Sequence, residues 1–580
     1  MKKHFAAFIL ALFVGAIYVG PDVYNTYTPG YQGIVMADSG DADFYFTVIN
    51  KSYESRGLVR DPFHYEYRDS GNPFQYFPIE FVLGKVGKAL GLRIDELAIA
   101  AEFFFPALLT LLLYAFAYGI SGSRLTAIAV AAAMLLGTEL VHPNGISNLF
   151  RNFIFRGEFS EFLSYSRPVN PQVSGLFFFA ALGALLHLLR APRSAWAIAL
   201  AGVSVGILAY IYPYFWMFAF VALGVMGLYA LAMRNWPLFF ATCASGFVAA
   251  LVMMPFLVAN LSIFVHGGGS QLTQAIPTHR VIVEKVILLP LFLYSIIFLW
   301  GWWSRGRGVV GEWAAAFAQK YLFVLLLLIA GVIVSNHQVI TGKLVFQQHF
   351  HFFTNIPMFV LAMTFLAMES LTLVPKVWRV LTVVALVVVC GWFALGVQVA
   401  SYRAHSEDSA RHQALAPMFA YLRAQGPGTV TLTNYYLATR LTIYTQGFTY
   451  MGGYDATFAV PKSQLVHDYF VMLALQGVAA GEVQTYLYGH RDEVGALLFI
   501  GTYWRDLCGS YGCFPDSVLD ALVPQYQKFL SQPLSQTIKT HKIDFILWDF
   551  KMEPEWRLKG LITEPAVVES GDFKLYAIKK

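Results

Sequence analysis

Long apolar runs, separated by short polar stretches, fill about the first 400 positions of the chain. A run of about 20 apolar residues is long enough to span the hydrocarbon core of a bilayer as a helix. Eleven such runs are predicted, at 4–20, 99–120, 125–141, 173–189, 195–212, 214–233, 237–259, 281–303, 321–335, 351–368 and 377–399. The pattern therefore predicts a mostly α-helical polytopic membrane domain over residues 1–400, with a large polar loop at 21–98.

The remaining residues, 401–580, have the polarity of a soluble protein and alternate between two patterns. Stretches rich in β-branched and aromatic residues predict strands, at 428–433, 494–500, 543–550 and 573–578. Two other stretches, 409–425 and 517–530, carry apolar residues at helical spacing. We expect a small α/β domain.

Composition agrees with a chain that lies largely in lipid. It is 57% hydrophobic and 13% charged, whereas about a quarter of a soluble domain is charged. The net charge of +5 is small, and no basic patch of the soluble part indicates nucleic acid. Neither a phosphate-binding P-loop nor the serine elbow of hydrolases is present.

The positions of basic residues predict the orientation. Lys2 and Lys3 precede the first run, which fits an uncleaved signal anchor better than a signal peptide because no small-residue cleavage site stands before Pro21. With these lysines in the cytoplasm, every predicted inner loop is basic, through Arg124, Arg190, Arg193, Arg234, Arg305, Arg307, Lys320, Lys376 and Arg379. Eleven spans then place 21–98 and 401–580 outside, and we expect a bacterial inner membrane with these parts in the periplasm.

Three aspartates crowd into "DSGDADFY" at 38–45, just before the aromatic residues 44–46. Long loops are usually functional. A carboxylate held against aromatics is partly desolvated, so its pKa rises and it becomes a better general base. A solvated loop explains the same acids equally well. Further on, "NPFQYFPIEFVLGKVGKALG" predicts an amphipathic helix that lies on the bilayer, with Lys85 and Lys88 on its polar side.

The order of these features resembles the GT-C superfamily of polytopic glycosyltransferases that use lipid-linked sugars, such as oligosaccharyltransferases. Three features match: one span before a large outer loop with an acidic motif ("GDADFYF"), a proline-aromatic element leading into an interfacial helix ("NPFQYFPIEF"), and an exported soluble domain after the helical bundle. The resemblance implies that a first-loop aspartate deprotonates or orients the acceptor. By position this is Asp43, with Asp41 as the alternate because Ala42 separates the two acids.

The same resemblance implies a cationic site, because a sugar leaving its carrier leaves an anionic phosphate behind. Outer basic residues run against the positive-inside pattern, although snorkelling or pairing with acids explains any single one. The candidates for the donor phosphate are Arg167, Lys343, Arg280, His349 and His351. The candidates for the sugar or acceptor are Asn170, Gln172, Asp61 and Tyr76, with an Asp-Pro turn as the other interpretation of Asp61.

Two further sites are expected. Some members of the superfamily hold a divalent ion at the acidic loop, and Asp41 and Asp43 can share Mg²⁺ or Mn²⁺ if the loop is extended. No other cofactor is expected. Cys508 and Cys513, in "CGSYGC" of the exported tail, predict a disulfide, and a zinc pair lacks a second pair of ligands nearby.

These observations predict an inverting membrane glycosyltransferase. It takes a sugar from a polyprenyl-phosphate carrier and passes it to a glycan, lipid or protein acceptor on the outer face. The alternatives are a lipid-linked glycan flippase or secondary transporter, and a non-catalytic scaffold with the same fold. Transporters place charges near the bilayer midplane, whereas the predicted spans here are almost free of charge.

Overall fold

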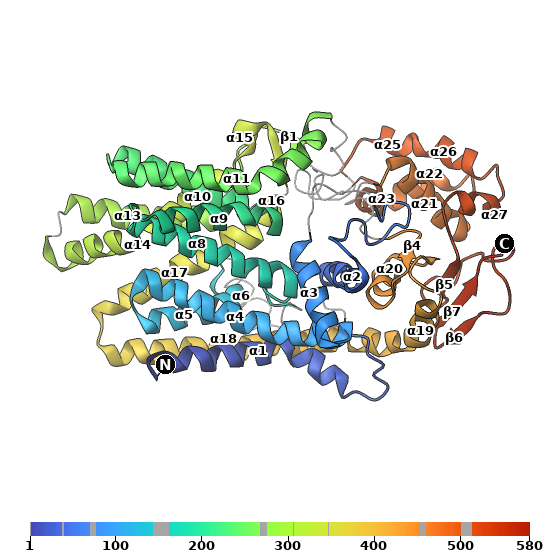
Figure 1. Cartoon of the computed structure of the whole chain (residues 1–580), viewed down its shortest axis with the longest axis horizontal. Coiled ribbons are helices and arrows are strands. Elements are labelled where there is room, and N and C mark those ends of the chain that lie inside the picture. Colours follow the sequence, from blue (N-terminus) through green and yellow to red (C-terminus); the bar gives the residue numbers. More distant parts are fainter. Residues whose placement is uncertain are drawn as a thin grey trace. The chain divides into compact units, whose positions relative to one another are not determined.

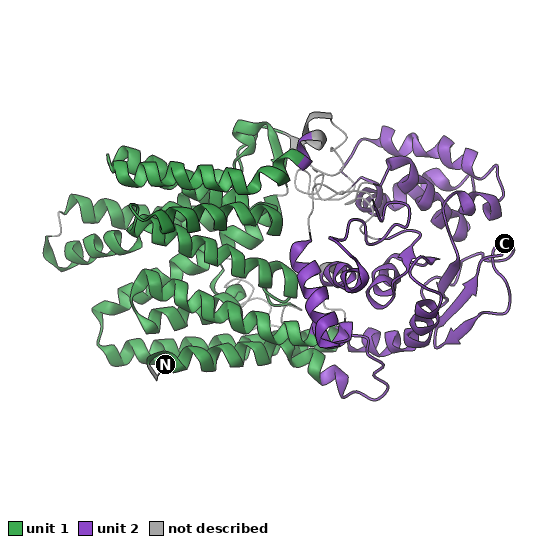
Figure 2. Ribbon diagram, viewed as in Figure 1, with its two compact units in different colours: residues 1–23, 99–258, 277–404 green, residues 24–98, 259–276, 405–580 purple. Residues whose placement is uncertain are grey.

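A computed structural model describes residues 2–36, 40–69, 77–142, 162–266, 275–304, 307–345, 347–452, 460–499 and 513–579. The chain divides into two compact units (Figure 2). Unit 1 comprises Met1–Val23, Ile99–Val258 and Pro277–Ala404, and unit 2 comprises Tyr24–Ala98, Ala259–Ile276 and His405–Lys580. Most of the predicted first outer loop is thus part of the same unit as the tail, whereas the sequence analysis placed this loop in the membrane domain.

The membrane part is built from long apolar helices (Figure 1). The elements from the chain's start and from Ile94 to His412 are η1 (Lys2–His4), α1 (Phe5–Thr26), α4 (Ile94–Ser121), α5 (Arg124–Leu136), α6 (Thr138–Val141), η3 (Pro168–Val173), α8 (Ser174–Arg190), α9 (Ala195–Ile211), α10 (Pro213–Ala232), α11 (Trp236–His266), β1 (Ala275–Pro277), α13 (Lys285–Trp303), α14 (Gly308–Val334), α15 (Gln338–Thr341), β2 (Lys343–Val345), α16 (Gln347–Phe350), η4 (His351–Asn355), α17 (Ile356–Ser370), η5 (Leu371–Leu373) and α18 (Lys376–His412).

Nine helices of the described residues are long and apolar enough to cross a membrane, and α5 and α9 are two shorter apolar helices. Each of the eleven predicted spans coincides with one of these eleven elements. The chain is therefore an integral membrane protein. Small side chains let its helices approach closely, as membrane packing requires: the run Ala131, Ala132 and Ala133 of α5 is completely buried.

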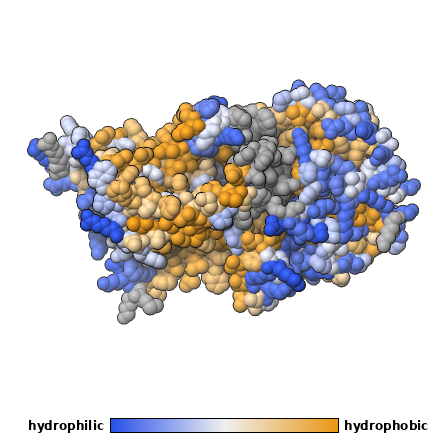
Figure 3. Space-filling model, turned by 45° about the horizontal axis from the view of Figure 1, so that its top comes forward, coloured by the Kyte–Doolittle hydropathy of each residue, from blue (hydrophilic) through white to orange (hydrophobic). Residues whose placement is uncertain are grey.

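The surface of unit 1 fits a bilayer. Apolar side chains cover much of its face in Figure 3, while polar ones gather over unit 2. Large tryptophans are exposed beside the basic loops that were predicted to lie inside, at Trp196, Trp236, Trp302, Trp303 and Trp378. Tryptophan is enriched where a helix meets the membrane–water interface. These positions therefore mark the helix ends that lie at one interface.

Unit 2 contains a five-stranded sheet of order β4-β3-β5-β7-β6, in which β3 is parallel to β4 and β5 while β7 is antiparallel to β5 and β6. Its elements are α2 (Gly40–Glu54), α3 (Pro78–Leu90), η6 (Gln413–Leu415), α19 (Ala416–Ala424), β3 (Val430–Leu432), α20 (Tyr435–Tyr444), β4 (Phe448–Thr449), α21 (Lys462–Leu475), α22 (Val483–Gly489), α23 (Arg491–Leu498), α25 (Asp516–Asp520), α26 (Leu522–Phe529), α27 (Leu534–Thr537), η8 (Ile538–Thr540), β5 (Phe545–Asp549), β6 (Val568–Ser570) and β7 (Phe573–Ala577).

The predicted α/β tail is confirmed, with one error. Strands form within 428–433, 543–550 and 573–578, and helices form within 409–425 and 517–530. The strand predicted at 494–500 is wrong, because residues up to Leu498 belong to α23. Asp492 and Glu493 occupy the first turn of this helix, where their negative charges stabilise the helix by interacting with its macrodipole.

The acidic stretch also differs from expectation, because α2 begins at Gly40 where an extended loop was predicted. The predicted amphipathic helix is confirmed as α3. It packs closely on α2 at Gly84, where an added Cβ would lie 2.6 Å from the backbone oxygen of Ile49. Its other side exposes Val82, Val86 and Leu90 at helical spacing, as expected of a helix that contacts lipid.

Candidate active site

Two helices far apart in the sequence, α2 and α20, form the framework of the candidate site within unit 2. Thr47 Oγ1 lies 2.9 Å from Thr442 Oγ1, although 395 positions separate the two residues. The amide of Asn50 donates to the backbone oxygens of Thr442 (3.1 Å) and Thr445 (2.7 Å). These side-chain hydrogen bonds join the middle of α2 to the C-terminal end of α20.

One turn before Thr47, Asp43 forms an ion pair with Arg440 of α20. Asp43 Oδ2 lies 3.2 Å from Arg440 Nε, and the two side chains are 11% and 2% exposed. Phe44, the next residue of α2, packs against Phe63 and Phe77 with ring centroids 5.9 and 5.7 Å apart. These rings pack around the residue that follows Asp43, and the partners of the Asp43 carboxylate itself are Arg440 and Thr439.

Arg440 is a fully buried cation whose donors are not all used. Nη1 donates to the backbone oxygen of Val35 at 2.9 Å, and Nε faces Asp43. Nη2 is buried and has no hydrogen-bond partner in the described part of the chain. A buried donor without a partner costs about 1–3 kcal/mol, so an anionic or carbonyl oxygen that reaches Nη2 would be bound favourably.

Burial raises the pKa of Asp43 above its usual value, against the opposing effects of the Arg440 charge and a hydrogen bond from Thr439. A raised pKa makes a carboxylate a stronger base once it has lost its proton. Arg440 meanwhile keeps the ionised form accessible in a buried place. Asp43 and Arg440 thus form a mostly buried charged pair in which the carboxylate can accept a proton.

A second cation, Lys51, lies two turns along α2. Its ammonium donates to the backbone oxygens of Gln446 (2.8 Å) and Gly447 (2.5 Å) and stands 3.9 Å from the ring centroid of Phe448. Burial lowers the pKa of Lys51 to about 7, while the nearby Asp61 acts in the opposite direction. Its contacts fix the loop after α20 onto α2.

Asp61 forms the turn that was its alternative interpretation. Its Oδ1 accepts from the backbone N–H groups of Phe63 (2.8 Å) and His64 (2.9 Å), and its Oδ2 lies 3.0 Å from His64 Nδ1. The side chain is almost completely buried. With three donors around it, this carboxylate holds the backbone and offers little to a substrate.

Two predicted phosphate ligands, Arg280 and Lys343, come together in unit 1. The backbone N–H of Thr278 donates to Gly342 O at 3.0 Å, and Gln338 Nε2 donates to Arg280 O at 2.9 Å. These contacts bring the segments that carry Arg280 and Lys343 side by side. Both side chains are exposed, and neither forms an ion pair with a carboxylate of the described residues. They can therefore receive an external anion.

The other three predicted phosphate ligands are more enclosed. The Arg167 guanidinium lies 5.4 Å from the ring centroid of Phe353, and His349 packs on the same ring at 5.7 Å. His349 Nδ1 also contacts the hydroxyl of Tyr212. His351 Nδ1 lies 3.0 Å from Glu284 Oε1, which places a carboxylate where a phosphate would have to bind.

Asn170 and Gln172, predicted to bind sugar hydroxyls, are both buried. Asn170 Oδ1 accepts from Ser174 Oγ at 2.6 Å, and Gln172 Nε2 donates to Glu102 (3.2 Å) and to the backbone oxygen of Tyr165 (2.9 Å). In this arrangement their amides hold the segment before α8.

Several predictions fall on residues that the structure does not describe: Tyr76, Cys508 and the side chain of Asp41. Cys513 is disulfide-bonded, and Cys243 and Cys390 carry free thiols. Asp41 and Asp43 both belong to α2, whereas the shared Mg²⁺ or Mn²⁺ was predicted for an extended loop. The ion itself stays a prediction.

Sequence reasoning missed Arg440 and Lys51. A signal for Arg440 exists in "YYLATRLTIY", where this arginine shares helical spacing with Leu437, Leu441 and Tyr444. A charged residue within an apolar stripe is expected to be buried, and a buried charge needs a partner. The partner's identity is not contained in that pattern.

Neither a family model nor a curated protein matches the chain. Among solved structures, it is similar to the apo oligosaccharyltransferase of Archaeoglobus fulgidus, at 12% identity and a TM-score of 0.44 over 95% of this chain and 70% of that one.

The chain is also similar to ArnT from Cupriavidus metallidurans bound to undecaprenyl phosphate, at 12% identity and a TM-score of 0.47 over 98% of this chain and 97% of that one. Both identities are low and both TM-scores lie below 0.5. The likeness therefore assigns no function, and the chemistry of the chain has to follow from its own residues.

Proposed function

We propose that this integral membrane protein is an inverting glycosyltransferase that transfers a sugar from a polyprenyl-phosphate carrier to an acceptor hydroxyl on the outer face of a bacterial inner membrane. The observation that carries the proposal is the Asp43 carboxylate of the predicted first outer loop, which is 11% exposed, has a raised pKa and is held by Arg440 of α20. A carboxylate in this state suits the removal of a proton from a hydroxyl as the sugar–phosphate bond breaks.

The departing polyprenyl phosphate needs positive charge. Exposed Arg280 and Lys343 on adjoining segments of unit 1 would bind it, with Arg167 and His349 as further ligands. Preorganised cations stabilise charge that develops on a leaving phosphate. This reaction needs no redox cofactor, and a divalent ion at the acidic stretch stays a prediction.

Release of the lipid carrier tests the proposal without knowledge of the acceptor. Membranes that contain the wild-type chain are supplied with a panel of synthetic undecaprenyl-phosphate sugars, and free undecaprenyl phosphate is measured by mass spectrometry. We expect release from at least one donor, and its loss in Asp43→Asn. Asp69→Asn is the matched control, because Asp69 is an exposed acid of the same loop.

A flippase or secondary transporter gives a different result. It would move the labelled lipid across proteoliposomes without breaking the sugar–phosphate bond. A scaffold would do neither, and Asp43→Asn would leave its partners bound. Intact donor throughout the panel, or equal release from wild type and Asp43→Asn, would contradict a glycosyltransferase with this base.

A further inference from the structure

His467, Asp468 and His541 form a group of potential metal ligands in unit 2, away from Asp43. His467 and Asp468 are consecutive residues of α21, and His541 follows η8 just before β5. One ligand atom from each lies within 4.8 Å of the others. The two imidazole rings meet edge to face, with centroids 5.1 Å apart. Two imidazoles and a carboxylate are ligands that suit Zn²⁺.

The hydrogen-bond geometry of His467 points to a cation. Its Nε2 lies 3.1 Å from the backbone oxygen of Thr537, and its Nδ1 lies 3.1 Å from Asp468 Oδ1. Both neighbours are acceptors, whereas a neutral imidazole carries one N–H. If Nε2–H donates to the carbonyl, the lone pair of Nδ1 faces a carboxylate oxygen, and this contact is favourable only with a cation between them.

That arrangement is also common among histidines that ligate metals. The ring nitrogen that does not bind the ion usually donates to a backbone carbonyl or a carboxylate, which fixes the ring. Here the Thr537 carbonyl would fill this role. The alternative is a doubly protonated His467 in an ion pair with Asp468, and the two states differ in whether they take up an ion.

A second observation comes from Tyr450. Its side chain is 3% exposed, and its hydroxyl has no hydrogen-bond partner in the described part of the chain. Its ring centroid lies 6.3 Å from that of His541. Zn²⁺ held by three protein ligands keeps a water as its fourth, and such a water would offer this buried hydroxyl a partner.

We propose that His467 through Nδ1, Asp468 and His541 bind one divalent transition-metal ion of the Zn²⁺ class. The site is independent of the glycosyltransferase proposal, because it uses neither Asp43 nor the cations of unit 1. Hard ions such as Mg²⁺ prefer oxygen ligands and are expected to bind much more weakly here.

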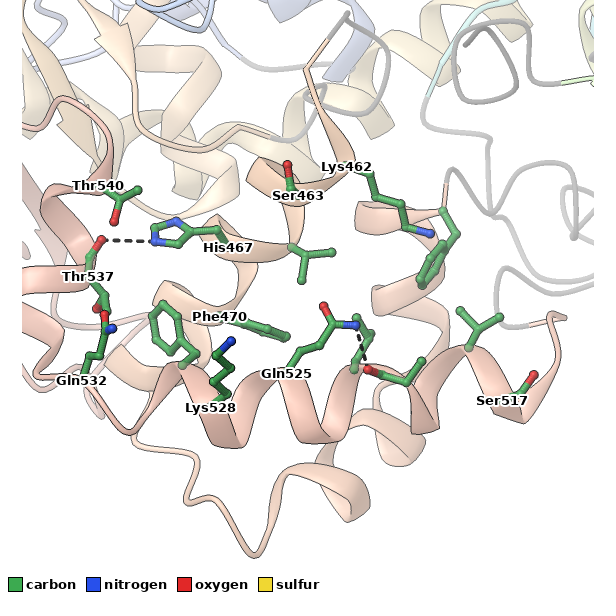
Figure 4. Close-up of a pocket in the computed structure, with 16 residues that line it drawn as sticks. Lys462, Ser463, His467, Phe470, Ser517, Gln525, Lys528, Gln532, Thr537 and Thr540 are labelled. Atoms are coloured by element: carbon green, nitrogen blue, oxygen red, sulfur yellow. Dashed lines mark hydrogen bonds between the residues drawn. The ribbon is translucent and has the colours of Figure 1, made fainter. Parts of the chain in front are cut away.

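The metal would stabilise one wall of a pocket of about 860 Å³ (Figure 4). His467, Thr537 and Thr540 lie on that wall, and Lys462 and Lys528 lie elsewhere around the pocket. The ion would join α21 to the segment that ends at His541, and so hold the wall between them. Loss of the metal is therefore expected to loosen this pocket.

The test uses untagged full-length protein in detergent, stripped with a chelator and then equilibrated with Zn²⁺ at neutral pH. Metal content by mass spectrometry is expected to reach one Zn²⁺ per chain, and Zn²⁺ is expected to raise the melting temperature. His541→Asn and Asp468→Asn are each expected to weaken Zn²⁺ binding at least about 10-fold in calorimetry. His490→Asn is the control, because His490 is exposed and belongs to the same unit.

Wild-type protein that takes up no stoichiometric Zn²⁺ and melts at the same temperature with and without it would overturn the proposal and leave the ion pair. Equal affinities of wild type and His541→Asn would overturn it as well. If a variant fails to fold, the stoichiometry and the melting temperature of the wild type still decide. Activity does not enter the test, so failure here is distinct from failure of the proposed function.

Discussion

Asp43 and Asp61 lie in the same polar loop, at 21–98, and are both buried, yet the partners of their carboxylates differ. Asp61 accepts three hydrogen bonds from its own turn. Asp43 has a lateral ion pair with Arg440 and a hydrogen bond from Thr439, and its side chain remains 11% exposed. Burial alone therefore does not identify a reactive carboxylate. A carboxylate whose partners are incomplete can still accept a proton from a substrate.

The largest expected effect concerns Asp43 itself. Asp43→Asn keeps the shape of the side chain but removes the base, and general base catalysis contributes about 10²–10⁴-fold to a rate. We expect release of undecaprenyl phosphate to fall by that factor, while the melting temperature stays near that of wild type. Activity of Asp43→Asn within about twofold of wild type would mean that Asp43, like Asp61, only holds the structure.

The counter-ion comes next. Arg440→Gln leaves a buried carboxylate without its cation, and breaking a buried ion pair in this way costs about 3–5 kcal/mol. We expect the free energy of unfolding in detergent to fall by about that much. The double variant Asp43→Asn/Arg440→Gln should recover part of the loss, because it leaves no unpaired charge. Additive effects in this cycle would contradict a coupled pair.

The pH dependence of turnover sharpens the contrast. Burial raises the pKa of Asp43 above 3.8, so turnover should increase with pH through this raised pKa, about tenfold per unit below it. The effect on stability has the opposite sign. The folded state holds the Asp43 proton more tightly than the unfolded state does, so protonation stabilises the fold. This stabilisation is complete below the unfolded-state pKa and is lost as pH rises through the folded-state pKa. Rate and melting temperature are measured across this range, with Asp43→Glu expected to displace the limb of the rate profile.

A smaller effect is expected at Asp61. In Asp61→Asn an amide oxygen can still accept from the two backbone N–H groups, but the contact with His64 Nδ1 loses its charge. Weakening one buried contact costs about 1–3 kcal/mol. We expect a lower melting temperature with unchanged turnover per folded molecule. A loss of turnover at full stability would remove the distinction between the two aspartates.

The smallest effect concerns the exposed cations of unit 1. An exposed charge pair contributes about 0.2–1 kcal/mol, so Lys343→Gln should raise the KM for the lipid-linked donor up to about fivefold with little change in kcat. Arg280→Gln should act similarly. The control is Lys376→Gln, an exposed lysine of a predicted inner loop. Equal KM values for all three variants would exclude Arg280 and Lys343 from the donor site.

The membrane helices were predictable because their signal is local. A run of apolar residues long enough to cross a bilayer can hardly satisfy its backbone hydrogen bonds there except as a helix. The same applies to α3, whose spacing of apolar residues survives in its exposed Val82 and Val86. In contrast, the first turn of α2 is polar, and such a sequence is typical of a loop. Only the tertiary contact of Asp43 with α20 shows why this turn is buried.

The partners of the site were beyond a single sequence. Arg440 and Lys51 form their contacts 405 and 395 positions away along the chain, and no local pattern encodes that pairing. The false strand at 494–500 has the same origin. A short apolar run fits a buried strand or a buried helix, and the tertiary structure determines which of them forms.

The pairing of α2 with α20 also has a consequence for biosynthesis. Thr47 and Thr439 touch across 392 positions. The apolar helices from α4 to α18 lie between them in the chain, so the ribosome completes these helices after α2 and before α20. During that interval Asp43 lacks Arg440 as its counter-ion, and the burial that raises its pKa has not yet formed. A chain that ends before α20 would therefore lack the Asp43–Arg440 pair, which forms only after the last quarter of the polypeptide has been made.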